Sequence, residues 1–279
     1  MKSAYDALSA SIEAKGVSVP AGTKLTGMPA LVDQIQTGGG GGLDYGYLTF
    51  TAVENTTLTL KQNGGIAPHK LLKSTDGLTW TKWENPATNG ISLNAGESVY
   101  LKADEDSLWR TGTGDNPYNI FSSTGKIKCE GDIRSLVKPI ALEDYSYFAR
   151  GLFNGCTFLT TAPELPSTIA TTRCYGGMFY GCKFLKTAPA LPATTLAEKS
   201  YGHMFSGCTS LTTAPELPAT TLAKFSYSNM FYGCTSLTTA PNISATTIAD
   251  YCCEHMFAGC TSLITAPELP ATTLANNCY

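Results

Sequence analysis

The residues best suited to chemistry stand near the end of the chain, where Cys252 and Cys253 precede His255. A thiol beside an imidazole could form the nucleophile and base of a covalent catalyst. A repeating pattern explains the same residues without chemistry, because Cys253 fills the slot that Tyr227 holds one repeat earlier and His255 fills the slot of Asn229. The sequence also lacks a C-x-x-C pair for zinc. We therefore predict that the protein is not an enzyme, with no catalytic residue, no metal site and no cofactor.

The chain has ten cysteines, and eight of them fall at two recurring positions of that repeat. Stacked cysteines such as Cys208 and Cys234 would come near the distance of a disulfide. A bridge at every step would strain a stack whose spacing is fixed by its strands, whereas a free cysteine packs well as a small apolar side chain. The spacing therefore favours reduced, buried cysteines over a disulfide scaffold.

From Phe153 onward the sequence repeats every 26 residues. The recurring positions are Phe153, Phe179, Phe205, Phe231 and Phe257, then Cys156, Cys182, Cys208, Cys234 and Cys260, then Leu159, Leu185, Leu211, Leu237 and Leu263. A fixed period of this length is typical of solenoids, in which each unit buries its apolar side against its neighbours. The period predicts a stack of coils within residues 140–279.

Each coil is predicted to contain one short helix and one short strand. Tyr175, Met178, Phe179 and Cys182 follow the i, i+3, i+4, i+7 spacing of one helical face. A strand is expected at 185–188, ended by the next residue, a proline that has no N–H for a ladder. The C-terminal segment is thus predicted to be an α/β solenoid.

The repeat motif resembles a known family. Aromatic-x-Gly-Cys-x-x-Leu-Thr-x-x-x-x-Leu-Pro is similar to the BspA-like leucine-rich repeats of bacterial surface proteins, especially of gut Bacteroidales and their phages, over about 127 residues in five copies. The resemblance implies a leucine-rich-repeat array that binds proteins or glycans and has no catalytic residues. This repeat is longer than the commoner form and lacks the asparagine of standard leucine-rich repeats, so the curvature does not carry over.

Three slots of the repeat vary between copies, and on a helix they would share the face opposite the apolar one. A variable side rich in aromatic, basic and amide groups is a candidate contact surface for carbohydrate or protein. Ordinary drift of a solvated face would give the same pattern. The predicted binding residues, here called the contact strip, are Arg173, Lys199, Phe225, Tyr251, Tyr180, Tyr232, His203 and His255.

The segment 44–139 is predicted to form an all-β, sandwich-like domain. It has short runs of β-branched and aromatic residues in rough alternation, separated by turns rich in Gly or Asn. Its run Ser74–Trp80 resembles a shortened Asp box, the hairpin of sialidase-like propellers. One copy cannot build a propeller, and Asp-Gly is a common hairpin turn, so sialidase chemistry is not predicted.

Residues 1–37 are predicted to be a short helical module, followed by a glycine linker at 38–43. Two narrow apolar stripes with helical spacing bury too little surface for an independent fold. The module is therefore expected to dock on a partner or self-associate, or else to form a helix pair folded onto the rest of the chain. Its stretch Ile12–Thr23 resembles a short N-terminal module of bacteriophage tail and fibre proteins, which implies attachment to other virion proteins.

Composition argues against two classes of function. With 15% charged residues, a net charge of −3 and four arginines among 19 basic residues, the chain lacks a cationic surface for nucleic acid. No stretch approaches the ~20 apolar residues of a membrane span. The N-terminus also lacks the apolar core of a secretion signal. We therefore predict a protein that neither binds nucleic acid nor inserts into a membrane.

These observations together predict a structural virion protein of a bacteriophage, a tail or head fibre that assembles in the host cytoplasm. Residues 1–37 would attach it to the particle, and the repeats would contact a glycan or protein on the host surface. A homo-oligomer is expected, specifically a trimer, as is usual for such fibres. The alternative is a BspA-like adhesin on the bacterial cell surface, which would need the export signal that is missing at the N-terminus.

Overall fold

The computed structural model describes four stretches of the chain, 46–62, 71–104, 119–136 and 146–279. The chain divides into two units, 1–46 and 47–279. The predicted helical module at 1–37 and the glycine linker at 38–43 lie outside the described residues. The described part of the second unit contains strands, turns and a 3₁₀-helix but no α-helix. The predicted combination of a helical module with an α/β solenoid is therefore wrong as a fold class.

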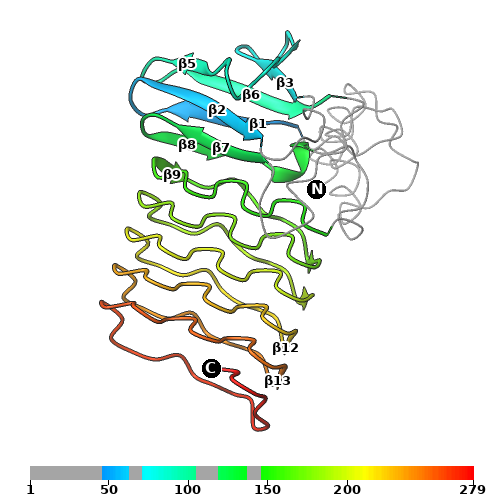
Figure 1. The fold of residues 1–279 in the computed structure, drawn as a ribbon, viewed down its shortest axis with the longest axis vertical. Coiled ribbons are helices and arrows are strands. Elements are labelled where there is room, and N and C mark those ends of the chain that lie inside the picture. Colours follow the sequence, from blue (N-terminus) through cyan, green and yellow to red (C-terminus); the bar gives the residue numbers. More distant parts are fainter. Residues whose placement is uncertain (1–45, 63–70, 105–118, 137–145) are drawn as a thin grey trace, which may run out of the picture. The chain divides into compact units, whose positions relative to one another are not determined.

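The first part of this unit consists of two sheets (Figure 1). The larger has the strand order β4-β3-β6-β1-β8-β9 and the smaller the order β5-β2-β7. The elements of this part are β1 (Leu48–Ala52), β2 (Thr56–Gln62), β3 (Leu71–Ser74), β4 (Thr81–Lys82), β5 (Ile91–Leu93), β6 (Ser98–Ala103), β7 (Asn119–Ser123), β8 (Ile127–Glu130) and the 3₁₀-helix η2 (Ile133–Leu136). The rings of Phe50 in β1 and Phe121 in β7 lie 4.9 Å apart, so both sheets contribute to one core.

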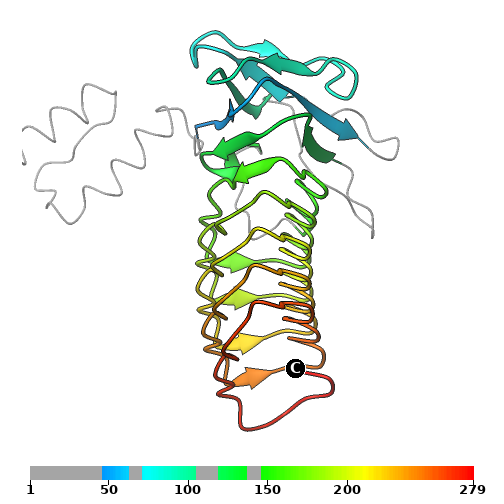
Figure 2. The ribbon, with the colours of Figure 1, turned by 90° about the vertical axis from the view of Figure 1, so that its left-hand side faces the viewer.

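The second part is a stack of coils (Figures 1 and 2). Its strands are β9 (Leu159–Thr161), β10 (Ile169–Ala170), β11 (Thr195–Leu196), β12 (Thr221–Leu222) and β13 (Thr247–Ile248). Strand β10 pairs in parallel with β11, and β12 with β13, so that each residue lies beside the one 26 positions further on. Strand β9 pairs in parallel with β8 and joins the stack to the larger sheet.

The helix predicted in each coil is replaced by a run of turns. Met178 N–H donates to the carbonyl of Tyr175, three residues earlier, whereas Phe179 N–H donates to Met204 of the next coil. Every fourth residue of this segment has a positive φ: Arg173, Gly177 and Gly181. An α-helix needs negative φ throughout and bonds that span four residues. A turn that repeats every four residues buries the same positions as a helix, and this explains why the spacing was misleading.

The predicted strand at 185–188 is also reduced. Only Thr187 forms a parallel bridge there, to Thr213, and the bridges continue to Thr239 and Thr265. The two-residue strands lie further along each coil, as at β11. Pro189 and Pro192 follow the shortened strand and supply no N–H to a ladder, which limits pairing to single bridges.

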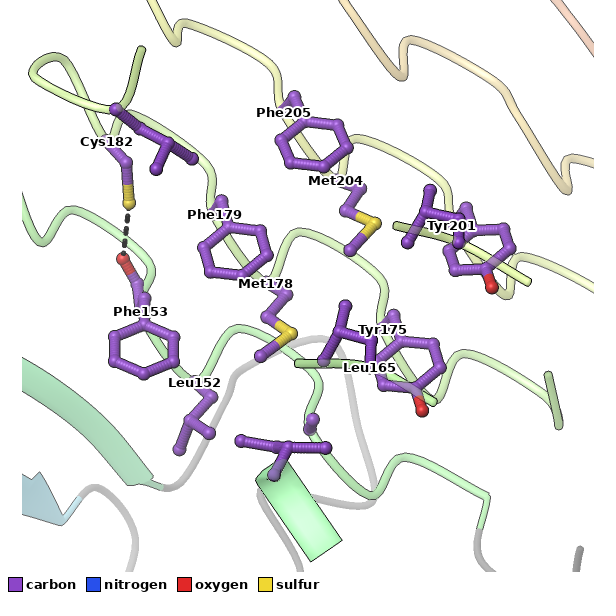
Figure 3. Close-up of a cluster of buried hydrophobic side chains, with 14 of the residues drawn as sticks. Leu152, Phe153, Leu165, Tyr175, Met178, Phe179, Cys182, Tyr201, Met204 and Phe205 are labelled. Carbon is purple, nitrogen blue, oxygen red and sulfur yellow. Dashed lines mark hydrogen bonds between the residues drawn. The ribbon is translucent and has the colours of Figure 1, made fainter. Parts of the chain in front are cut away.

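A column of phenylalanine rings runs through the coils (Figure 3). Phe153, Phe179, Phe205, Phe231 and Phe257 stack with centroid distances of 5.6, 5.5, 5.6 and 5.7 Å in that order. Phe121 of β7 stacks on Phe153 at 5.5 Å and continues the column into the two sheets. The sheets therefore cover the first coil, as the end of a stacked repeat requires.

The recurring cysteine also makes a repeated contact. The Cys182 thiol donates to the carbonyl oxygen of Phe153 in the preceding coil at 3.2 Å (Figure 3). Three further pairs repeat this bond at 3.1 Å, namely Cys208 with Phe179, Cys234 with Phe205 and Cys260 with Phe231. All ten cysteines are free and buried, in agreement with the preference for reduced core thiols.

These thiols are expected to resist alkylation in the folded protein. Burial raises the pKa of both Cys174 and Cys234 to about 12, and only the thiolate reacts. At about pH 8 we expect iodoacetamide to modify these two sites at least about 100-fold more slowly in the native chain than in the urea-unfolded chain. Peptide mass spectrometry after timed quenching measures both rates. Equal rates in the two states would contradict the buried positions.

Candidate binding surface

The eight residues of the contact strip all lie in described coils, and none of them is buried. Tyr180, Tyr232, His203 and His255 are exposed, and Arg173, Lys199, Phe225 and Tyr251 are half-buried. The exposed fractions of Tyr180 and Tyr232 are 47% and 50%, which is large for aromatic side chains beside a well-packed core. The coils therefore present apolar rings to solvent along one side.

The half-buried members belong to a column with left-handed backbone, here called the positive-φ column. It consists of Tyr147, Arg173, Lys199, Phe225, Tyr251 and Asn277, with φ of 66°, 56°, 57°, 58°, 59° and 47°. A residue other than glycine costs roughly 1–2 kcal/mol in this conformation. A neighbouring left-handed slot holds only glycine, at Gly155, Gly181, Gly207, Gly233 and Gly259. The chain thus bears strain in the positive-φ column, and also in the slot of His203, Asn229 and His255, whereas it avoids strain in the glycine slot.

Side chains of the positive-φ column contact one another along the stack. The guanidinium of Arg173 lies 5.6 Å from the ring centre of Tyr147, and Lys199 Nζ lies 4.8 Å from that of Phe225. The rings of Phe225 and Tyr251 stack at 4.9 Å with an angle of 16° between their planes. Cations over ring faces and offset ring pairs are both mildly attractive. The column is therefore an ordered row of basic groups that continues into a row of rings.

A cavity of about 330 Å³ lies beside the basic end of this column. The groups with polar or aromatic chemistry around it include Arg150, Arg173, Tyr180, Lys199, His203 and Phe225. Five of these six belong to the contact strip, so the structure brings a majority of the predicted residues together. Among the residues that the structure describes, no aspartate or glutamate lines this cavity. Three basic side chains, Arg150, Arg173 and Lys199, therefore belong to its described wall.

The remaining three strip residues lie elsewhere. Tyr251 stacks on Phe225 beyond the cavity, and Tyr232 is exposed without lining it. His255 instead lines a second, mostly apolar cavity of about 270 Å³, together with Cys253 and Met256. The predicted strip is thus one cavity with an aromatic extension, not a continuous site of eight residues.

One slot of the repeat lines the cavity in four successive coils and holds glycine in two of them. Arg150, Gly176, Gly202 and Ser228 follow one another at intervals of 26 residues, and all four line the cavity. A methyl group added at Gly202 would lie 3.3 Å from the carbonyl oxygen of Phe225. The backbone of the next coil therefore packs closely against these two glycines, between a guanidinium in the coil before them and a hydroxyl in the coil after them.

Arg150 and two polar lining residues, Asn154 and Ser228, were missed in the sequence. Arg150 precedes the first recognised phenylalanine, Phe153, and for that reason was not aligned with the repeat. Extending the 26-residue register backwards places it in the slot of Gly176. This register is the sequence feature that could have identified Arg150 as part of the repeat.

The charge of Arg150 affects His203 on the same cavity. Partial burial, with a smaller contribution from the Arg150 guanidinium, lowers the pKa of His203 below its ordinary value. His203 is therefore neutral at physiological pH and can donate or accept a hydrogen bond. The positive charge of the cavity at that pH comes from Arg150, Arg173 and Lys199.

The possible catalytic cysteines take part in structural contacts. The thiol of Cys252 lies 3.9 Å from the sulfur of Cys253 and 3.5 Å from the carbonyl oxygen of Cys278. Hydrogen bonding to Cys252 and burial both raise the pKa of Cys253. Cys252 and Cys253 are buried, whereas His255 is exposed. Cys253 and His255 line the same cavity of about 270 Å³, but the raised pKa of Cys253 disfavours the thiolate that a nucleophile needs.

The run that resembles an Asp box forms the turn between β3 and β4, which pair antiparallel. The Asp76 carboxylate accepts hydrogen bonds from the backbone N–H groups of Thr79 and Leu78 at 2.7 and 2.8 Å and from the Ser74 hydroxyl at 2.8 Å. These bonds hold the pKa of Asp76 well below its usual range. The aspartate thus closes a hairpin, as its place beside Gly77 predicted.

Comparison with protein-family models, with curated proteins and with solved structures finds no match to this chain. In the described stretches, no three or more His, Cys, Asp or Glu side chains are arranged to hold a metal ion. Those stretches also contain no helix that could cross a bilayer. The cavity and the positive-φ column are the two features of the described stretches that suggest a binding role.

Proposed function

We propose that this protein is a structural attachment protein of a bacteriophage virion, a tail or head fibre. Residues 1–37 bind other virion proteins, and the coils contact a glycan or a protein on the host surface. The proposal rests on the motif at Ile12–Thr23 for the particle end and on the contact strip for the host end. Assembly is in the host cytoplasm, and the working form is a homotrimer.

The observation that carries the contact role is the strain in the positive-φ column. Strained backbone persists where function uses the residue, and glycine would remove the strain at Phe225 and Tyr251 at once. The chain instead keeps two aromatic rings there and two cations at Arg173 and Lys199. Rings beside hydrogen-bond donors offer large contact area at little cost in entropy.

A bacterial cell-surface adhesin is the second candidate, and the BspA-like repeat motif favours it. Both candidates use the coils for binding, and they differ in what holds the other end of the chain. A trimer would place three strips on one host cell, and several weak contacts acting together would give useful attachment.

Mass spectrometry of purified phage particles, with uninfected bacterial envelopes analysed in parallel, tests the proposal. We expect the chain in particles at a few copies or more per virion, and a trimer for the purified chain in analytical ultracentrifugation. The purified chain should also bind host cells saturably. Detection in bacterial envelopes together with absence from particles would replace the virion role with the adhesin role. Failure of the chain to bind any host cell would remove both.

A further inference from the structure

We infer that the cavity beside the positive-φ column binds an acidic sugar, a saccharide unit that carries a carboxylate or a sulfate. The inference rests on the proposed function and names the chemical class that the coils would recognise. The anionic group would meet Arg150, Arg173 and Lys199, and the hydroxyl groups of the sugar would meet the uncharged polar groups of the wall.

Charge is the first argument. Three basic side chains line one cavity, and no carboxylate belongs to the part of its lining that the structure describes. Guanidinium groups pair with carboxylate and sulfate oxygens through two parallel N–H bonds, and five donors allow each arginine to keep a protein neighbour while it holds a ligand. The acidic group nearest to Lys199 that forms an ion pair is Glu198, at 3.8 Å with half of its side chain exposed. Such a pair is weak, so a ligand anion can displace it.

The orientation of Phe225 is the second argument. Lys199 Nζ lies over its ring and Tyr251 stacks on it, so the ring faces are occupied along the column. The part of Phe225 that borders the cavity is then its edge, which carries the positive end of the ring quadrupole. An aromatic edge beside three cations favours an anion over a cation or a purely apolar group.

The size and the polar groups of the cavity are the third argument. Ligand pockets range from about 300 to 1,000 Å³, and a volume of about 330 Å³ suits one compact group. Asn154, Ser228 and Tyr180 supply an amide and two hydroxyls. These groups can donate to and accept from sugar hydroxyls. An acidic peptide could form ion pairs with the three basic side chains, but its backbone would need a longer groove. The cavity is instead a compact hollow whose wall is formed by successive coils.

Binding of the full-length chain to sugars displayed on a polymer tests the inference. The acidic probes are glucuronic acid, N-acetylneuraminic acid and galactose 6-sulfate, and the neutral probes are glucose and galactose. We expect the acidic polymers to bind at least about tenfold more tightly than the neutral ones, and salt to weaken that binding. Comparing the carboxylates with the sulfate identifies which anion the cavity prefers.

The variant that tests the cavity itself is Arg173→Asn with Lys199→Asn. Asn277 occupies the same slot with positive φ, so asparagine fits the backbone there and the fold should persist. We expect this double variant to lose at least about tenfold in affinity for the acidic polymers. The matched control is Lys183→Asn with Lys186→Asn, which removes two exposed charges that do not line the cavity. Its affinity should stay within about twofold of the parent.

Three results would overturn the inference. They are equal binding of acidic and neutral polymers, equal binding of polyglutamate and the acidic sugars, and equal losses in the two double variants. If any of these is found while the parent chain still attaches to host cells, the proposed attachment role stands and only the sugar class is wrong. If the parent attaches to no host cell, the proposed function itself fails.

Discussion

Replacing Phe205 by alanine is expected to lower the free energy of unfolding by about 3–5 kcal/mol, as for other fully buried phenylalanines. Phe205 is completely buried. Its ring stacks on Phe179 at 5.5 Å and on Phe231 at 5.6 Å. Removing it breaks two ring contacts at once and leaves a cavity in the middle of the column, where the coils on both sides are held by hydrogen bonds and cannot collapse inward.

Urea unfolding followed by circular dichroism measures this loss, and Phe184→Ala is the matched control. Phe184 is 37% exposed and stacks on Phe158 at the surface at 5.8 Å, so its loss should be within about 1 kcal/mol. Because each coil contacts only its neighbours, hydrogen exchange in the Phe205 variant should speed up most in the coils that follow the substitution. Equal losses for the two variants would show that the phenylalanine column is not the main core.

The sequence predicted which residues are buried better than it predicted the backbone that buries them. The 26-residue register identified the Phe, Cys and Leu columns, because packing of identical units requires the same side chain in every copy. The prediction of a helix in each coil was wrong, because the spacing of apolar residues indicates which side of the chain is buried but does not indicate which backbone hydrogen bonds form. Gly177 and Gly181, four residues apart, were a signal of repeated positive φ that helical spacing concealed.

The binding surface was predictable only in part. Variation between copies identified Arg173, Lys199 and Phe225, since a slot free of packing can change from coil to coil. The cavity beside them could not be predicted from these residues alone, because its wall also includes Gly176, Gly202 and Arg150, which come from another slot of the repeat. A hollow is a property of neighbouring coils in three dimensions, and a slot-by-slot comparison does not show it.

The double variant Phe225→Gly with Tyr251→Gly is expected to reduce attachment to host cells at least about tenfold, with the free energy of unfolding within about 1 kcal/mol of the parent. Glycine at positive φ relieves roughly 1–2 kcal/mol at each site. A more flexible unfolded chain costs about 0.5–1 kcal/mol per glycine, and the lost ring pair costs about 0.5–1.5 kcal/mol. These terms nearly cancel in stability, whereas both rings are lost from the contact surface.

The alanine pair, Phe225→Ala with Tyr251→Ala, separates the two effects. It removes the same rings but keeps a side chain at φ of 58° and 59°. We expect it to attach as poorly as the glycine pair and to be less stable than that pair by at least about 1 kcal/mol, the reverse of the usual order of alanine and glycine. Thermal melts and cell-binding assays measure both quantities. If alanine is the more stable, the backbone there is not left-handed; if both variants attach normally, the rings are ordinary surface and the column carries no contact role.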